Sequence, residues 1–358
     1  MSDNPSREPQ SLLVVRLGAM GDIVHALHAV SALRNALPVT RIGWIVEERW
    51  VELLCAKDSP RSGPRDAGRP LVDVVHAVNT KSWRKALLSL QTRREIAAAF
   101  RTIRRQGYDM AVDFQGALKS AVFARWAGAS QVLGMQNPRE APARWFYRQR
   151  VPIAAGHVVE QYRALAEAIA GRPLQQPAVE FPEDHRSEAM IAEKLVQARG
   201  DFVLISPGAG WGAKQWPPRR YGEVARALAR DGLRPLVNFG PTENELAAEV
   251  AAASGSSAVR VECSISELIA LTRRARLFIG GDTGPLHLAA ALHVPVVAIF
   301  GPTDPARNGP YGTRSVVLRH PSSRTSLSHT SAADPGLLQI TSEEVVAAAR
   351  RLLGVSYG

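Results

Sequence analysis

The sequence contains little cysteine: Cys55 and Cys263 are the only two among 358 residues. They lie far apart and show no metal-type spacing, which argues against a disulfide framework and predicts a reduced, cytoplasmic protein. The sequence also lacks any apolar run near the ~20 residues that span a bilayer. Its polar first ten residues lack the apolar core of a signal peptide.

Acidic residues are too few to balance the basic ones. The chain has 33 Asp and Glu against 44 Lys and Arg, a formal net charge of +11. Between residues 81 and 105 a single acid, Glu95, accompanies Lys81, Arg84, Lys85, Arg93, Arg94, Arg101, Arg104 and Arg105. A second cluster contains Arg139, Arg144, Arg148 and Arg150. This density predicts an anionic partner, namely nucleic acid, an acidic lipid surface or an acidic small molecule; a solvated basic helix face is the plain alternative. Because interleaved aromatics are missing and the charge gathers in one half, we expect no nucleic acid.

The length predicts two domains, and the apolar pattern predicts their class. Expected strands of the first half are 11–17, 41–47, 72–78 and 108–114, and expected helices begin at Ile23 and cover 91–106 and 118–126. Segment 171–177 breaks the pattern as a linker. Expected strands then follow at 202–206, 234–240, 276–279 and 294–301, and expected helices at 221–230, 243–252, 266–274 and 345–353. This alternation predicts an α/β protein of two doubly wound, Rossmann-like domains, 1–172 and 184–358, with a cleft between them. A terminal helix, 341–354, is expected to pack back on the N-terminal domain.

The segment 280–291, Gly-Gly-Asp-Thr-Gly-Pro-Leu-His-Leu-Ala-Ala-Ala, is the most informative stretch. It follows an expected strand and opens a helix with Pro285 in the first turn, and Asp282 and Thr283 are expected to cap that helix. Free N–H groups and the helix dipole at such a turn suit a phosphate. Because Asp282, Thr283 and His287 are packed into six residues there, we favour a functional site over a plain buried turn.

Three further segments lie at expected strand ends. The loop 18–22, Gly-Ala-Met-Gly-Asp, allows close backbone approach, although Asp22 also suits a plain helix N-cap. The loop 206–217 is glycine-rich and presents Lys214, a natural neutraliser of phosphate charge unless it is only a solvated lysine. Segment 113–120 is the third. Neither glycine-rich loop has the spacing of a dinucleotide fingerprint or a P-loop. In 301–305, Asp304 is expected to form a turn.

These motifs, in this order, resemble the ADP-heptose:lipopolysaccharide heptosyltransferases of glycosyltransferase family 9, from about Leu12 to Leu353. The resemblance rests on Gly-Asp-Ile at 21–23, Lys-Gln-Trp-Pro at 214–217, Gly-Asp-Thr-Gly-Pro-Leu-His at 281–287 and Phe-Gly-Pro-Thr-Asp-Pro at 300–305. Segments 44–48, 82–86, 139–142 and 145–148 look most like type I heptosyltransferases. Segment 208–214 is closer to type II. The resemblance is therefore strongest to type I, and type II or another ADP-heptose transferase of the family remains the alternative.

The resemblance implies a GT-B fold, with the donor in the C-terminal half and the acceptor in the N-terminal half. The implied reaction is inverting transfer of L-glycero-D-manno-heptose from ADP-heptose to Kdo of the lipid A precursor in the lipopolysaccharide inner core. Asp22 is the implied base. The implied donor residues are Lys214, Asp282, Thr283, Gly284, His287, Glu243, Ala209 and Gly210. The implied acceptor residues are Gly21, Gln115, Lys119, Arg84, Lys85 and Arg139.

Two departures from the family pattern affect these assignments. Ala209 and Gly210 replace small hydroxyl residues, so backbone N–H groups would have to make those contacts. Glu245 competes with Glu243 for the ribose. Since Lys214 and a helix end supply positive charge, we expect neither a metal nor a cofactor besides the donor substrate. A protein that docks peripherally on the cytoplasmic face of the anionic inner membrane would use the basic clusters. A sugar-nucleotide epimerase remains the alternative on the same fold.

Overall fold

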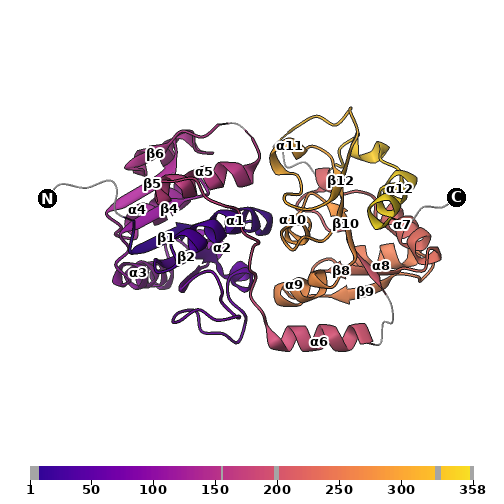
Figure 1. Cartoon of the computed structure of the whole chain (residues 1–358), viewed down its shortest axis with the longest axis horizontal. Coiled ribbons are helices and arrows are strands. Elements are labelled where there is room, and N and C mark those ends of the chain that lie inside the picture. Colours follow the sequence, from indigo (N-terminus) through magenta and orange to yellow (C-terminus); the bar gives the residue numbers. More distant parts are fainter. Residues whose placement is uncertain (1–7, 155, 197–200, 327–331, 355–358) are drawn as a thin grey trace. The chain divides into compact units, whose positions relative to one another are not determined.

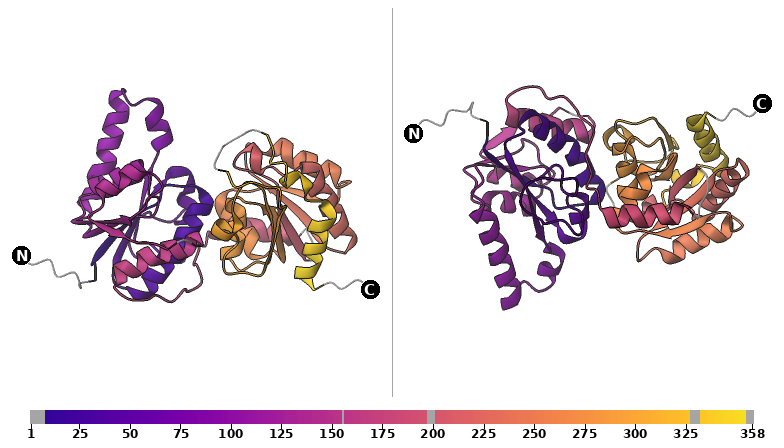
Figure 2. Two further views of the ribbon diagram at one scale, coloured as in Figure 1. Left: turned by 90° about the horizontal axis from the view of Figure 1, so that it is seen from above. Right: turned by 60° about the horizontal axis from the view of Figure 1, so that its bottom comes forward.

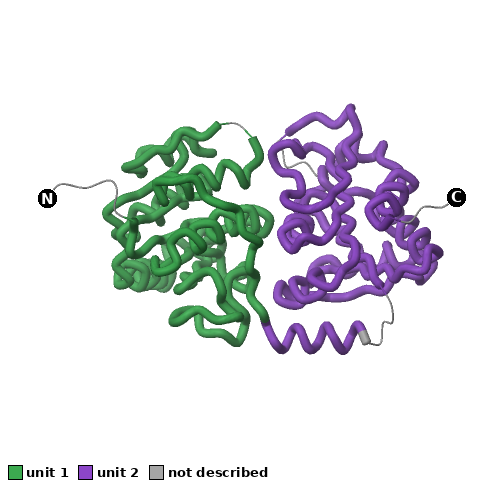
Figure 3. Tube along the Cα trace, viewed as in Figure 1, with its two compact units in different colours: residues 1–183 green, residues 184–358 purple. Residues whose placement is uncertain are grey.

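The computed structural model describes residues 8–154, 156–196, 201–326 and 332–354. The contacts divide the chain into two compact units, residues 1–183 and residues 184–358 (Figure 3). Each unit has a central parallel sheet of six strands with helices around it (Figure 1), which confirms the expected α/β class. The segment after Gly171 counts with unit 1, since Gln176 Nε2 donates to His28 O at 3.0 Å and Glu183 N to Ala67 O at 2.8 Å.

Unit 1 has the strand order β3-β2-β1-β4-β5-β6. Its strands are β1 Ser11–Val15, β2 Arg41–Glu47, β3 Val74–Val78, β4 Met110–Asp113, β5 Gln131–Met135 and β6 Gln149–Val151. Its helices are α1 Met20–Ala36, α2 Thr80–Lys85, α3 Leu90–Arg105, α4 Leu118–Trp126 and α5 Val158–Ala170, with 3₁₀ turns η1 Glu48–Leu53 and η2 Ala141–Phe146.

The core of unit 1 is built on strands that are buried on both faces. Leu13 and Val15 of β1 pack with Ile103 of α3 and Phe123 of α4. Because side chains alternate along a strand, the equally buried Leu12 and Val14 face the other way. Helix α1 lies on that second face, since right-handed connections from β1 to β2 and from β4 to β5 run on opposite sides of the sheet.

Unit 2 repeats this arrangement in the order β12-β11-β10-β7-β8-β9. Its strands are β7 Phe202–Ser206, β8 Arg234–Phe239, β9 Val259–Glu262, β10 Leu277–Gly281, β11 Val296–Phe300 and β12 Ser315–Arg319. Its helices are α6 His185–Val196, α7 Pro218–Arg230, α8 Asn244–Ala253, α9 Ile265–Arg273, α10 Gly284–Ala291, α11 Pro305–Asn308 and α12 Ser342–Leu353, with η3 Gly212–Lys214 and η4 Leu337–Gln339.

Trp216 belongs to the core of unit 2, although it lies in the glycine-rich loop that carries Lys214. Its ring is fully buried and meets the Tyr221 ring edge-on, with the centroids 4.7 Å apart. Its Nε1 donates to Ile340 O at 3.1 Å, just before α12. The tryptophan of the Lys-Gln-Trp-Pro motif therefore anchors the loop that carries Lys214.

Several short elements differ from the sequence-based expectation. Helix α12 packs on α7, β10, β11 and β12 of its own unit, with Val345 and Ala349 in that core. Its expected packing on the N-terminal domain stays a prediction. Strands β9 and β12 were not expected, because neither contains an apolar run longer than three residues. Strand β5 was missed since it contains Gly134, where a Cβ would lie 2.3 Å from the Tyr147 ring.

Candidate functional site

The strand order of unit 2 places two loops side by side at the carboxyl edge of its sheet. β7 and β10 are neighbours, but the chain leaves β7 toward β8 and leaves β10 toward β11, in opposite directions. Such a reversal opens a crevice where ligands bind in doubly wound sheets. The loop after β7 carries Lys214, and the turn after β10 carries Asp282 and Thr283.

Lys214 and Asp282 form an ion pair across these two loops. Lys214 Nζ contacts Asp282 Oδ2 and lies over the Trp211 ring, 4.2 Å from its centroid. His287 Nε2 lies 3.1 Å from Asp282 Oδ1. Burial opposes ionisation of Asp282, but the hydrogen bond and charge of His287 and the charge of Lys214 outweigh it and hold its pKa below the usual range.

The carboxylate of Asp282 is thus committed to side chains and not to the backbone of α10. The expectation that Asp282 and Thr283 cap this helix is wrong for both side chains. Thr283 occupies the N-cap position without a side-chain cap, and its hydroxyl donates to Gly281 O at 3.3 Å. The first turn of α10 consequently keeps its N–H groups pointed out of the helix beside Lys214, an arrangement that attracts an anion.

The loop after β8 joins the same edge through Glu243. Its Oε2 accepts a hydrogen bond from Gly240 N at 3.0 Å. Its Oε1 lies 2.2 Å from the place where a Cβ on Gly208 would be, so this glycine lets the carboxylate approach the loop after β7. Ala209 and Gly210 follow directly in that loop. Glu245 instead lies exposed in the first turn of α8.

Unit 1 has its own reversal of strand order between β1 and β4. Gln115, after β4, accepts a hydrogen bond from Leu17 N, after β1, at 3.1 Å. Asp22 lies in the first turn of α1, where its Oδ2 accepts from Ala19 N at 3.2 Å. Gly21 precedes it in the same turn.

Arg16 is a residue of this edge that the sequence analysis missed. Its guanidinium lies 2.5 Å from Asp22 Oδ2 and 5.8 Å from the centroid of the Tyr162 ring. Burial opposes its charge, but Tyr162, Asp22 and Asp113 outweigh that effect and raise its pKa. The side chain of Asp22 stays 41% exposed, so its carboxylate is held by a buried cation and still open to solvent. The signal in the sequence that could have identified Arg16 was a basic residue at the end of an apolar run.

Asp113 shapes the turn that carries Gln115. It is fully buried and accepts from Gln115 N at 2.8 Å, Ser120 Oγ at 2.9 Å and Tyr147 OH at 2.7 Å. Burial raises the pKa of Asp113 against the effect of these bonds. Its role in the structure is to hold the loop, whereas Gln115 faces the strand end next to it.

The structure gathers some of the remaining acceptor candidates and leaves others apart. Lys119 Nζ donates to Thr80 Oγ1 at 2.8 Å and lies 3.5 Å from Glu47 Oε1, which joins α4 to the start of α2. The backbone of Arg139 backs the turn at Gly116. Arg84 and Lys85 are exposed in the last turn of α2, farther along that helix.

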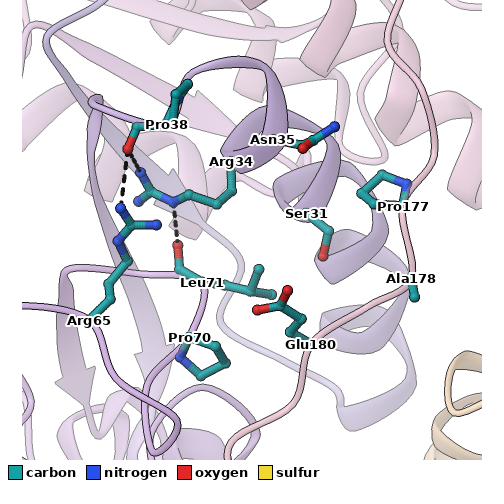
Figure 4. Close-up of a pocket in the computed structure, with 10 residues that line it drawn as sticks. All are labelled: Ser31, Arg34, Asn35, Pro38, Arg65, Pro70, Leu71, Pro177, Ala178 and Glu180. Carbon is teal, nitrogen blue, oxygen red and sulfur yellow. Dashed lines mark hydrogen bonds between the residues drawn. The ribbon is translucent and has the colours of Figure 1, made fainter.

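A cavity of about 250 Å³ in unit 1 lies elsewhere (Figure 4). Its lining includes Ser31 and Arg34 from the C-terminal half of α1, so it belongs to the opposite, amino edge of the sheet. Arg34 there is engaged with Leu71 O at 3.0 Å, Thr40 O at 2.7 Å and Asp73 Oδ2 at 2.7 Å. These bonds hold the loop before β3, so this cavity is structural.

The chain matches known proteins over most of its length. The sequence profile of glycosyltransferase family 9 (heptosyltransferase) matches residues 96–335. Lipopolysaccharide heptosyltransferase 1 of Pseudomonas aeruginosa is 31% identical over 313 residues, which cover 86% of this chain and 83% of that protein. The chain belongs to glycosyltransferase family 9. It is therefore a glycosyltransferase, which decides against the epimerase alternative.

Two further comparisons place this family member. Lipopolysaccharide heptosyltransferase 1 of Escherichia coli strain K12 is 29% identical, covering 87% of this chain and 93% of that protein. The solved E. coli heptosyltransferase WaaC with ADP-2-deoxy-2-fluoro heptose superposes with a TM-score of 0.76 at 26% identity, covering 95% of this chain and 99% of that one. This chain therefore has the two-domain GT-B fold of the heptosyltransferases.

Within the part of the chain that the structure describes, no group of three or more His, Cys, Asp and Glu side chains forms a potential metal site. Within the same residues, no helix combines the length and the apolar character needed to cross a bilayer.

Replacing Asp282 by Asn should lower the free energy of unfolding by about 3 kcal/mol at neutral pH, because it leaves the charge of Lys214, whose side chain is only 11% exposed, uncompensated. The lowered pKa of Asp282 means that its contribution is complete above about pH 4 and is lost as the pH falls toward the folded-state pKa. Denaturant unfolding of Asp282→Asn and wild type at neutral and acid pH should therefore give a difference that shrinks in acid.

Asp201→Asn is the matched control, since Asp201 pairs with Arg276 on the surface. That substitution should cost less than about 1 kcal/mol. Equal losses for the two variants would contradict the role given to the buried pair.

Proposed function

We propose that this chain transfers L-glycero-D-manno-heptose from ADP-heptose, with inversion, to Kdo of the lipid A precursor in lipopolysaccharide inner-core synthesis. The observation that carries the proposal is the ion pair of Lys214 beside the uncapped start of α10, in a chain similar over 95% of its length to a heptosyltransferase solved with an ADP-heptose analogue. Lipopolysaccharide heptosyltransferases 1 from two organisms support the same reaction.

On the donor side, Lys214 and the N–H groups of Thr283 and Gly284 hold the diphosphate. Asp282 already positions Lys214. An entering diphosphate therefore competes with the Asp282 carboxylate for the ammonium group of Lys214. Asp282 and His287 then orient the sugar or phosphate. The N–H groups of the loop that contains Ala209 and Gly210 complete the anion site, and Glu243 binds the ribose.

On the acceptor side, Asp22 acts as the base. Arg16 holds Oδ2, whereas Oδ1 forms no hydrogen bond within the described part of the chain and is available to an acceptor hydroxyl. Asp22 takes the proton as the Kdo oxygen attacks the anomeric carbon of heptose. The bond from that carbon to the diphosphate breaks on the opposite face, and its electron pair stays on ADP, next to Lys214.

The other acceptor candidates supply recognition. The loop containing Gly21 lets the acceptor approach, and Gln115 and Lys119 lie on the same carboxyl edge of unit 1. Arg84, Lys85 and Arg139 are exposed cations that suit the Kdo carboxylates and lipid A phosphates. The proposed acceptor-binding residues are therefore Gly21, Gln115, Lys119, Arg84, Lys85 and Arg139.

The reaction as proposed needs no metal and no cofactor besides ADP-heptose, since Lys214 and the start of α10 supply positive charge to the leaving group. The protein works in the cytoplasm, peripherally on the cytoplasmic face of the inner membrane. Basic side chains of α3 support this placement, because each contributes about 1 kcal/mol of attraction near an anionic leaflet.

Transfer to two acceptors tests the proposed reaction. The purified chain should add one heptosyl unit to Kdo-lipid A and none to the same acceptor already carrying its first heptose, as followed by mass spectrometry. Transfer to the heptosylated acceptor alone would make the chain a type II enzyme. Release of free heptose without any acceptor product would contradict the transfer.

Asp22→Asn should reduce turnover by about 10²-fold or more, because general base catalysis contributes 10²–10⁴-fold. ADP binding, measured by calorimetry, should stay unchanged. Asp109→Asn is the control: Asp109 accepts from Ser11 N at the start of β1, at the opposite edge. Turnover above about a tenth of the wild-type rate in Asp22→Asn would exclude it as the base.

A further inference from the structure

The turn between α2 and α3 exposes three leucines. Leu87, Leu88 and Leu90 are 54%, 85% and 70% exposed, and every residue from 84 to 91 is exposed. We call these three residues the leucine tip. Both views of Figure 2 show the α2–α3 pair projecting from the rest of unit 1. Large apolar side chains at the end of a projecting element need a partner to leave water.

The base of this projection is firmly packed. Trp83 of α2 is buried, stacks on Phe123 of α4 and donates from Nε1 to Glu95 Oε2 at 3.1 Å. Phe100 of α3 stacks on the same Phe123, with ring centroids 5.0 Å apart. Because the base is held by aromatic packing, the exposure of the tip is a built feature of the fold.

Basic residues flank the leucine tip on both sides in the sequence. The basic collar consists of Arg84, Lys85, Arg93 and Arg94, all exposed. Arg93 Nε also donates to Leu87 O at 3.4 Å. The acid nearest to the collar, Glu95, is engaged by Trp83 and by Gln91. Apolar side chains flanked by cations match a lipid leaflet with anionic headgroups, which offers both an acyl layer and negative charge.

We propose that the leucine tip inserts into the acyl boundary of an anionic membrane while the basic collar contacts its headgroup phosphates. This inference rests on the membrane contact of the proposed function but goes beyond it, since it assigns an inserting element. Attraction by charge alone is screened at high salt, where the Debye length falls to about 3 Å at 1 M. Insertion of leucine is not screened. The two contributions can therefore be separated.

Vesicle co-sedimentation at low and high salt tests the inference. The vesicles contain phosphatidylethanolamine with about one quarter phosphatidylglycerol. The triple variant Leu87→Ser/Leu88→Ser/Leu90→Ser should bind at least tenfold more weakly than wild type at both salt concentrations. Arg93→Glu/Arg94→Glu should lose binding mainly at low salt. Turnover of the leucine variant on a short soluble Kdo acceptor should equal that of wild type.

Val39→Ser is the matched control for Leu88→Ser, because Val39 is 93% exposed in the same unit but lies before β2. Only Leu88→Ser should weaken vesicle binding. Equal binding of wild type and the triple variant would overturn insertion, even if the transfer reaction stands. Loss of self-association in the triple variant, without a change in vesicle binding, would likewise overturn it and assign the tip to a second copy of the chain.

A fluorophore at Leu88→Cys gives an independent readout. Burial raises the pKa of both native thiols, that of Cys263 to about 12, so they react slowly with the label. An environment-sensitive dye at position 88 should shift to the blue with the anionic vesicles and keep that shift at high salt. A dye that stays water-exposed while the protein is bound would show surface contact without insertion.

Discussion

The ion pair between Lys214 and Asp282 is the interaction on which the proposed donor site depends. It joins the loops after β7 and β10, the two neighbouring strands from which the chain departs in opposite directions. Desolvating the buried carboxylate of Asp282 and the ammonium group of Lys214, whose side chain is 11% exposed, costs free energy, which their mutual attraction and the bond to His287 offset. The same contact leaves α10 without a side-chain cap. The ion pair thus positions the ammonium group of Lys214, and it leaves the N–H groups at the start of α10 open. In the proposed function, Lys214 and these N–H groups bind the same anion.

The repeated strand order imposes a comparable arrangement on unit 1. The loops after β1 and β4 meet through Gln115 and Leu17, and Asp113 is buried beneath them to hold the turn. There the buried cation is Arg16, and it steadies an exposed carboxylate, Asp22, instead of a buried one. In the proposed reaction, unit 2 presents positive charge to the diphosphate, whereas unit 1 presents a carboxylate to the acceptor hydroxyl. These are the two groups that the proposed inverting transfer requires.

Local sequence predicted what depends on local pattern. Buried parallel strands are continuous apolar runs, so the expected strands at 41–47 and 202–206 coincide with β2 and β7. The motif loops were predicted at carboxyl strand ends, where Lys214 and Asp282 do lie. Edge strands such as β12 could not be predicted, because their exposure leaves no periodic signal in the sequence. The pairing of Asp282 with a lysine 68 residues away could not be predicted either, because a long-range contact leaves no such signal. Arg16, in contrast, did leave a signal in the sequence, as a basic residue at the end of an apolar run.

The affinity of Lys214→Met for ADP tests the central claim most directly. Calorimetry should show ADP binding weakened about tenfold to a hundredfold, since a charge-assisted hydrogen bond contributes about 1.5–3 kcal/mol. Lys194→Met is the control, because Lys194 forms an exposed contact with Glu267 at 3.4 Å in the same unit and should bind ADP as wild type does. Unchanged affinity in a folded Lys214→Met protein would contradict the account, for the ion pair would then serve the fold alone.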